Sequence, residues 1–374
     1  MANIVDYIDW RGDVDFSISP FNEVDNIILC QISYLNFDGI LESDFNRNGI
    51  TLRELSERFV SSADFDIRSD LGAMLNKGTA ALLPKLGESE RFGSLRVSGY
   101  VSKIDNEAEE QFCAVTYTCD KGAASPWNVT VYRGTDDTIV GWKEDFNLGF
   151  MDIVPAQRDA LIYAQSAMTA LKGNFILCGH SKGGNLALYA AANLPEKLQR
   201  RLEAVYNNDG PGFPEDFFRR PQYLAIRNRE HSFMPENSIV GMLFSHAEGF
   251  VTVESDGIGI MQHDPFTWHV QARNFVRLPD LNDQSKFIGK TVNEWFDELD
   301  REQKRQFVET VFGILEETNA TTNSELAENW MDNIMIMLKA MTHLDSKTRE
   351  ASWKTIQLLL KNAWENKDEF RRHR

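Results

Sequence analysis

The sequence has little cysteine and fewer basic than acidic residues. Its four cysteines (Cys30, Cys113, Cys119 and Cys178) show no metal-ligand spacing and indicate no disulfide framework. Lysine and arginine number 39 against 56 aspartates and glutamates, a formal net charge of −17. That balance argues against nucleic acid or an anionic membrane as a general partner. No apolar stretch is long enough to span a membrane, and the first residues resemble no signal peptide. These absences predict a cytoplasmic protein without stable membrane insertion.

What is present divides the chain into three regions. Residues 1–92 read as a helical N-terminal segment packed on the core, with a capping box at Thr51-Leu52-Arg53-Glu54. Residues 93–278 alternate strand and helix, which predicts an α/β core with a mainly parallel sheet. Residues 279–374 read as a C-terminal helical region. In the core we expect a hairpin at 94–103 and 111–119, and strands at 128–132, 174–178, 202–206, 223–227 and 250–254.

The C-terminal region predicts helices at 291–315 and 324–344, followed by a last helix. That helix carries Trp353, Ile356, Leu360 and Trp364 at helical spacing, which is typical of a packing face. The tail at 365–374 is rich in charge and is expected to be solvated.

The segment Gly-His-Ser-Lys-Gly at 179–183 carries the strongest chemical signal. A short apolar run precedes it and an alanine- and leucine-rich run follows it, so a buried strand turns abruptly into a helix. Gly-x-Ser-x-Gly in that setting is typical of a nucleophile elbow, which exposes a serine hydroxyl above the end of the sheet. The pattern fits neither a P-loop nor a dinucleotide-binding fingerprint. The plainer alternative is that Ser181 only caps the helix.

A serine hydroxyl needs a base, and in α/β-hydrolases the chain order is serine, acid, histidine. Six histidines follow Ser181. His263 lies on a glycine-bearing loop after the expected last strand and is the preferred base. His269, which we expect at the start of a helix, is the second choice. His246 precedes that strand and His373 lies in the charged tail.

The sequence leaves the acid less well defined. Asp209 follows the strand after the elbow helix, at the strand end where doubly wound sheets place their chemistry. It could equally bond its own Asp-Gly-Pro-Gly turn. Glu230 and Glu236, after the next expected strand, remain alternatives. Asp264 ranks low because it neighbours His263 in the sequence, and adjacent side chains diverge.

The remaining requirement is a pair of donors for an oxyanion. The backbone N–H of Lys182, the residue after the serine, is one. The other is expected from Thr135, in the Arg-Gly-Thr-Asp segment that follows an early strand.

Together these motifs resemble the class 3 lipases. Tyr-Arg-Gly-Thr at 132–135, Gly-Trp at 141–142 with Asp145, and Gly-His-Ser-x-Gly-Gly at 179–184 carry the likeness. It implies that Ser181 is the nucleophile, that Thr135 serves the oxyanion hole and that residues 136–150 form a lid. More closely, the chain resembles a bacterial family of uncharacterised lipase-like α/β-hydrolases, through its Asn3–Gly12 segment, Asp-Gly-Pro-Gly-Phe at 209–213 and Gln-His-Asp at 262–264. That likeness runs to about residue 300.

Two departures from class 3 lipases stand out. Lys182 occupies the position after the serine, where leucine is usual in that family. No aspartate stands in the segment at 230–235 that would match the family's acid, which is why Asp209 is preferred.

The resulting expectation is an α/β-hydrolase fold with helical additions, and a serine esterase acting through an acyl-enzyme on Ser181, with His263 and Asp209. No cofactor or metal is expected. The expected partner is a small-molecule acyl ester rather than dispersed triglyceride, and the oligomeric state stays open. The alternatives are a thioesterase with the same residues and a non-catalytic binding or regulatory module that keeps the fold.

Overall fold

The computed structural model describes residues 1–45, 49–72, 75–120, 126–247 and 249–323, with single residues at 325, 336, 346, 348, 350, 354 and 357. The expected Trp353–Trp364 stripe and the tail at 365–374 lie outside the described residues, as does most of the helix expected at 324–344.

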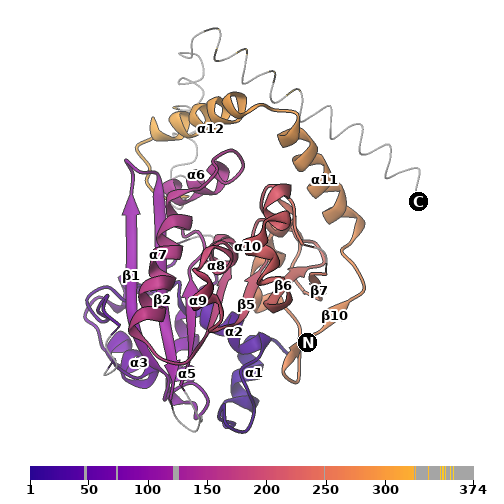
Figure 1. Cartoon of the computed structure of the whole chain (residues 1–374). Coiled ribbons are helices and arrows are strands. Elements are labelled where there is room, and N and C mark those ends of the chain that lie inside the picture. The colour runs from indigo at the N-terminus through magenta and orange to yellow at the C-terminus, as the bar shows by residue number, and fades with distance from the viewer. Residues whose placement is uncertain are drawn as a thin grey trace.

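Among the described residues, eight strands form one sheet in the order β1-β2-β3-β4-β5-β6-β7-β10 (Figure 1). The five strands from β3 to β7 are parallel, while β1, β2 and β3 pair antiparallel at one edge and β10 pairs antiparallel with β7 at the other. This confirms a mainly parallel α/β architecture. The strands are β1 (Arg96–Asp105), β2 (Glu110–Cys119), β3 (Trp127–Tyr132), β4 (Asn174–His180), β5 (Leu202–Asn208), β6 (Glu230–Pro235), β7 (Val251–Val253) and β10 (Arg277–Leu278), with β8 (Val270–Gln271) and β9 (Asn274–Phe275) in a separate hairpin.

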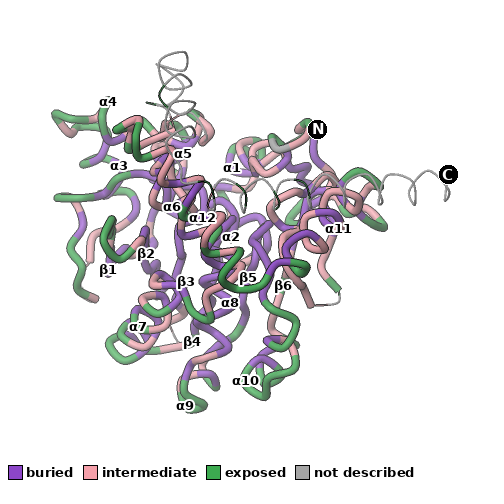
Figure 2. The backbone as a smooth tube through the Cα atoms, turned by 90° about the horizontal axis from the view of Figure 1, so that it is seen from above, coloured by how far each residue is buried: buried purple, intermediate pink, exposed green. Residues whose placement is uncertain are grey.

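Helices cover both faces of the sheet (Figure 2). The N-terminal helices α1 to α5 lie on one side of the strands, and α7 to α10 lie on the other. The helices are α1 (Ile4–Arg11), α2 (Glu23–Ile32), α3 (Leu52–Val60), α4 (Phe65–Arg68), α5 (Thr79–Glu88), α6 (Ile139–Asn147), α7 (Pro155–Ala170), α8 (Lys182–Asn193), α9 (Glu196–Gln199), α10 (Pro221–Leu224), α11 (Asp283–Asp297) and α12 (Arg301–Glu316). The chain is therefore layered as helix, sheet, helix.

The layering follows from alternation along the buried strands. In β4, Ile176 and Cys178 belong to one apolar core, whereas Phe175 and Leu177 belong to the other. Successive side chains of a strand point to opposite faces, so an unbroken apolar run buries both sides of a sheet. The first core also holds α2, every residue of which is buried. The N-terminal segment therefore supplies part of the core of the sheet.

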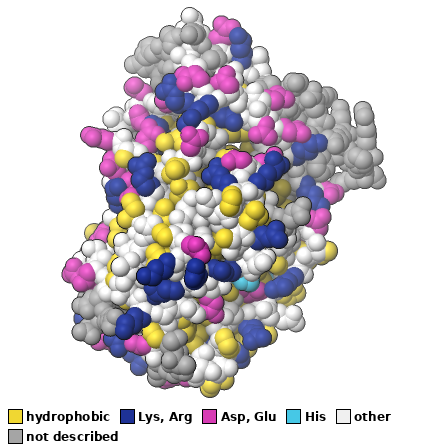
Figure 3. Space-filling view, viewed as in Figure 1, with side chains coloured by type: hydrophobic (Ala, Val, Ile, Leu, Met, Phe, Trp, Pro, Cys, Tyr) yellow, Lys and Arg dark blue, Asp and Glu magenta, His cyan; other side chains and the backbone are white. Residues whose placement is uncertain are grey.

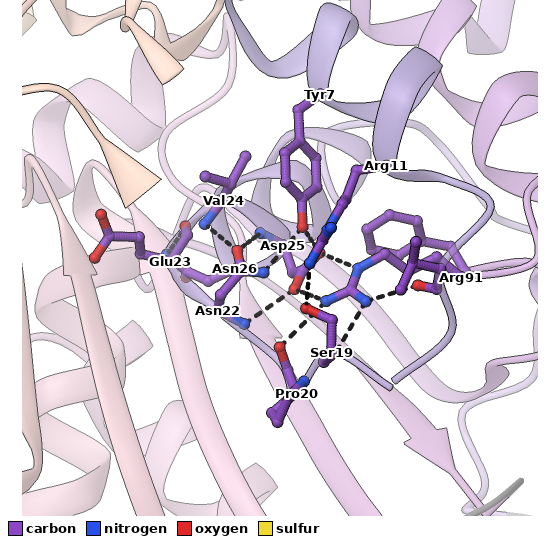
Figure 4. Close-up of polar contacts among 12 residues, drawn as sticks. Tyr7, Arg11, Ser19, Pro20, Asn22, Glu23, Val24, Asp25, Asn26 and Arg91 are labelled. Carbon is purple, nitrogen blue, oxygen red and sulfur yellow. Dashed lines mark hydrogen bonds and ion pairs between the residues drawn. The ribbon is translucent and has the colours of Figure 1, made fainter. Parts of the chain in front are cut away.

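A buried ion pair holds the chain around α2 in place (Figure 4). The Arg91 guanidinium donates to both carboxylate oxygens of Asp25, at 2.7 and 2.5 Å, and neither side chain is exposed. The same guanidinium donates to the carbonyls of Val14 and Ser19, at 2.9 and 3.0 Å. The Tyr7 hydroxyl donates to Asp25 at 3.0 Å. This set, the Asp25–Arg91 network, joins α1, α2 and the turn between them to the chain that follows α5.

Three expected elements differ in the structure. The prediction of a strand at 223–227 is wrong. Helix α10 and a short 3₁₀ helix at Arg227–Arg229 occupy these residues, and the strand begins at Glu230. The helix expected at 291–315 is two helices, separated where Asp300 caps α12. His269 does not begin a helix; it lies between a bridge at Trp268 and β8.

The described part of the chain contains no helix with the length and apolar character needed to cross a membrane. On the face shown in Figure 3, basic and acidic side chains are interspersed, with hydrophobic side chains between them.

Candidate active site

Ser181 occupies the turn between β4 and α8 in a strained conformation. Its φ of 59° and ψ of −136° lie in a region that residues other than glycine rarely adopt. Its backbone N–H donates to the carbonyl of Asn208 at 2.9 Å, which holds the turn against the end of β5. Although Ser181 stands at the N-cap position of α8, its side chain makes no capping hydrogen bond. The hydroxyl is therefore not used to cap the helix.

Glycines make this turn sterically accessible. A Cβ on Gly183 would lie 2.1 Å from the carbonyl oxygen of Tyr132, so only glycine lets α8 approach the end of β3 this closely. A Cβ on Gly134 would lie 2.9 Å from Cβ of Ser181 and 2.3 Å from the Tyr34 hydroxyl. The Arg-Gly-Thr segment after β3 thus runs in contact with the serine.

His263 and Asp209 meet at the same end of the sheet. Nδ1 of His263 lies 2.6 Å from Oδ2 of Asp209, and the second carboxylate oxygen accepts from the Ser238 hydroxyl at 2.5 Å. The Asp209 side chain is fully buried, whereas His263 is 22% exposed. Because an ionised carboxylate only accepts, Nδ1–H of a neutral His263 is the donor and Nε2 carries the free lone pair. Asp209 has a φ of 51°, so its backbone is also strained.

His180, the residue before the serine, supports His263. Its ring lies 4.4 Å, centroid to centroid, from the His263 ring. Its Nε2–H donates to the His263 carbonyl at 2.8 Å, so Nδ1 is left to accept from the Tyr34 hydroxyl at 3.1 Å. Burial, with the neighbouring His263, holds the pKa of His180 well below its usual range, which keeps this ring neutral. A neutral ring is what the two hydrogen bonds require.

The sequence analysis did not identify His180 or Tyr34. His180 could have been found, because it is part of the elbow motif. Tyr34 lies just after α2 and carries no local signal, since its contact with His180 joins residues 146 positions apart.

The alternative residues lie in other surroundings. His269 has carboxylate oxygens of Glu254 and Asp256 at 3.1 and 2.8 Å from its two ring nitrogens. Burial lowers its pKa, but these two carboxylates outweigh burial and raise it. His246 faces the Leu243 carbonyl at 3.1 Å, and His373 is not among the described residues.

Of the competing acids, Glu230 and Asp264 accept hydrogen bonds from other side chains. Glu230 begins β6 rather than following it, and it accepts from the Tyr223 and Ser232 hydroxyls, both at 2.7 Å. Glu236 follows β6, where its backbone N–H donates to Val253 at 3.1 Å. Asp264 accepts from the Asn76 amide at 2.6 Å.

The two residues expected to supply oxyanion donors belong to the segments around Ser181. Lys182 opens α8, so its backbone N–H belongs to the first turn, which has no intrahelical acceptor. The Thr135 hydroxyl donates to Oδ2 of Asp145 at 2.5 Å. Burial is the main cause that raises the pKa of Asp145 to about 6, and its Oδ1 has no hydrogen-bond partner. The Thr135 hydroxyl is thus committed to Asp145, which leaves the backbone N–H as the other donor of this residue.

Among the described residues, no group of three or more histidine, cysteine, aspartate and glutamate side chains is arranged to hold a metal ion. The four cysteines are all buried.

Comparisons with known proteins give one family and two remote structures. No curated protein matches the chain. Among solved structures, the M37 lipase is similar at 14% identity with a TM-score of 0.36, covering 58% of this chain and 68% of that one. The Rhizomucor miehei lipase–propeptide complex is similar at 16% identity with a TM-score of 0.32, covering 55% and 67%. Likenesses this remote carry no argument about function. The Mbeg1-like family model matches residues 86–313, well over half of the sequence, and the chain belongs to the Mbeg1-like family.

Proposed function

We propose that this protein is a serine hydrolase of α/β-hydrolase fold that cleaves carboxylic esters through an acyl-enzyme on Ser181. The observation that carries the proposal is the strained serine at the strand–helix turn, with the His263–Asp209 pair at the same end of the sheet. A helix-capping serine has no need of that backbone strain, and a turn-forming aspartate has no need of a histidine at 2.6 Å.

In the proposed mechanism, Nε2 of His263 takes the Ser181 proton as the oxygen attacks the ester carbonyl. Asp209 keeps the proton on Nδ1 and stabilises the imidazolium that forms. The backbone N–H groups of Lys182 and Thr135 donate to the oxyanion of the tetrahedral intermediate. The imidazolium then protonates the leaving alkoxide, and water activated by His263 releases the acid and regenerates Ser181.

The proposed substrate is a modest acyl ester rather than a dispersed triglyceride. A net charge of −17 provides no attraction to anionic interfaces. Rates on p-nitrophenyl esters of increasing chain length, measured beside emulsified triolein, test this choice. Acyl-thioesters of matched chain length, assayed in parallel, separate an esterase from a thioesterase.

The decisive experiment is labelling with a fluorophosphonate probe, followed by peptide mapping. The parent protein should be labelled at Ser181, and Ser181→Ala should lose both labelling and hydrolysis, by up to about a million-fold in turnover. Ser238→Ala, which removes a different buried serine hydroxyl of the site, should still be labelled at Ser181. A parent protein that is never labelled would favour the non-catalytic module, and an alanine variant labelled as fully as the parent would end the claim that Ser181 is the nucleophile.

A further inference from the structure

Lys182, the departure from the class 3 lipase pattern, has a buried and fully bonded side chain. Its Nζ donates to the carbonyl oxygen of Gln111 at 2.8 Å, to Oε1 of Gln111 at 2.8 Å and to Oε2 of Glu144 at 2.9 Å. An ammonium has three N–H donors, so all three are used. The side chains of Lys182 and Glu144 are both 0% exposed. The elbow residue is therefore tied to α6 by an ion pair sealed from water.

Glu144 uses both of its carboxylate oxygens. Oε2 also accepts from the backbone N–H of Gln111 at 3.0 Å, and Oε1 accepts from the backbone N–H of Ala156 at 2.8 Å. Through this one side chain, α6 is joined to β2, to the first turn of α7 and to α8. We call this set of contacts the Glu144 bridge.

The Glu144 bridge reaches both proposed oxyanion donors. On one side it holds the side chain of Lys182, whose backbone N–H is the first donor. On the other side stands the next residue of α6, Asp145, which accepts the Thr135 hydroxyl at 2.5 Å. Two consecutive residues of α6 thus bond the side chains of the two residues that carry the proposed donors.

The outer side of α6 is also covered. Ile139 packs in one cluster with Val308 and Phe312 of α12, and its backbone N–H donates to the Thr321 carbonyl at 2.9 Å. In Figure 1, α12 runs across the top of the molecule beside α6. The segment that the class 3 resemblance makes a lid is held from both sides.

We propose that the Lys182–Glu144 ion pair is a positioning device, which fixes α6 against the elbow and sets the separation of the two oxyanion donors. The inference rests on the proposed function, and it deepens it: α6 is a fixed wall of the site, not a lid that opens at a lipid surface. Soluble esters should then be hydrolysed at the full rate without an interface.

The first test separates catalysis from folding. Lys182→Met and Glu144→Gln each leave one buried group without its partner, and each should lower kcat on a soluble p-nitrophenyl ester by about a hundredfold, with KM within about threefold. The double variant removes both charges, so it should regain thermal stability over the single variants while kcat stays low. Its loss should also be far smaller than the product of the two single losses, because the residues act together.

A matched control lies next to Glu144 on the same helix. Lys143→Met removes a lysine that pairs with Glu109 and Glu316 at 2.9 and 3.5 Å, nearer the surface. It should leave kcat within about twofold of the parent, as exposed pairs contribute little.

The second test does not depend on catalysis. Hydrogen exchange at the backbone amides of α6 should be at least about tenfold faster in Lys182→Met and Glu144→Gln than in Lys143→Met. If the protein proves not to hydrolyse esters, this measurement still decides whether the ion pair fixes α6.

A third measurement addresses the lid directly. The hydrolysis rate is measured as the ester concentration is raised past its solubility limit. It should stay within about twofold of the rate extrapolated from soluble concentrations, with no jump. A jump of tenfold or more would overturn the fixed wall. Single variants with unchanged kcat and unchanged exchange at α6 would overturn the positioning role.

Discussion

Among the residues that the structure describes, two ion pairs are wholly buried, Asp25–Arg91 and Glu144–Lys182. Each guanidinium or ammonium is saturated with acceptors, and each carboxylate also accepts from the surrounding chain. Burying such charges is costly, and a pair of apolar residues of similar volume is often as stable. Chemically the two are alike, so what distinguishes them is what they connect.

The first pair joins parts of the N-terminal layer to each other (Figure 4). The second joins the residue after Ser181 to the helix that carries Asp145. The difference teaches that a buried ion pair here holds two segments in a fixed relative position. Asp25–Arg91 does so in the scaffold, and Glu144–Lys182 does so at the site. The two pairs should accordingly fail in different ways when broken, and four measurements test that contrast.

Of the four, the largest effect on turnover is expected at Asp209, a buried carboxylate of the candidate site that belongs to neither ion pair. Asp209→Asn should leave the unfolding midpoint nearly unchanged and reduce turnover by up to about ten-thousand-fold, because the amide stabilises the wrong His263 tautomer. Steady-state hydrolysis beside chemical unfolding measures both. Glu236→Gln is the control and should keep turnover within about twofold. An Asn variant with most of its activity would mean that Asp209 serves only its own turn.

The variant Arg91→Met tests the ion pair of the scaffold, Asp25–Arg91. Removing the guanidinium leaves Asp25 buried without a counter-charge, which should lower the free energy of unfolding by about 3–5 kcal/mol. Turnover per active serine, titrated with a fluorophosphonate, should stay within about twofold of the parent. Should the variant not fold, Asp25→Asn/Arg91→Met removes both charges and takes its place. A tenfold loss per titrated serine would erase the distinction between the two ion pairs.

Acid should weaken the molecule through His246, a residue outside both ion pairs. Burial lowers the pKa of His246 to about 4, against about 6.5 in the unfolded chain. Between those values the unfolded state binds more protons, so stability should fall as pH drops from 6.5 to 4, by about 3 kcal/mol for this residue.

Urea unfolding at pH 7.5 and 4.5 compares the parent with His246→Gln, which should lose about 2–3 kcal/mol less over that interval. Asp145, with its pKa raised to about 6, and Glu110, raised to about 7, act in the opposite direction. Their contributions are common to both proteins and cancel in the difference. Equal pH dependence in the two proteins would contradict a neutral His246 in the folded state.

The smallest effect concerns Tyr34, which links the scaffold to the site. Tyr34→Phe removes the donor to Nδ1 of His180 and should lower kcat about fivefold, the equivalent of one hydrogen bond of about 1 kcal/mol, with KM unchanged. Tyr100→Phe is the matched control, because that hydroxyl accepts from Phe37 at 3.3 Å and makes no contact with His180. Equal losses in kcat for the two variants would show a general packing effect instead.

Much of the sheet could be predicted, because its strands are apolar runs. The expected hairpin and the strands at 128–132, 174–178, 202–206 and 250–254 all coincide with strands in the structure. The failure at 223–227 has a physical cause. Tyr223 and Ile226 are three residues apart, and both enter the second core beside Phe217, as neighbouring positions on a helical turn do.

The true strand, β6, was hidden because only its last three residues are buried. The single helix expected at 291–315 overlooked the start of α12, which the capping box of Asp300 with Gln303 marks.

The candidate site divides in the same way. Motif and chain order were enough to select Ser181, His263 and Asp209, and the structure brings the last two within 2.6 Å. The Lys182–Glu144 pairing was out of reach, because nothing local to either residue signals a partner 38 positions away. Contacts of that kind depend on the finished topology.

The burial of α2 sets the order in which this protein can fold. Asn26 exchanges side-chain hydrogen bonds with Asn208, 182 residues further on, and Glu23 accepts from the backbone of Phe275, 252 residues further on. During synthesis α2 is therefore made well before β9, the strand that it has to contact. Such distant contacts slow folding, since each requires a long loop to close before it contributes. Throughout that delay the apolar residues of α2 are exposed to other chains, so chaperone capture of the growing chain should centre on α2.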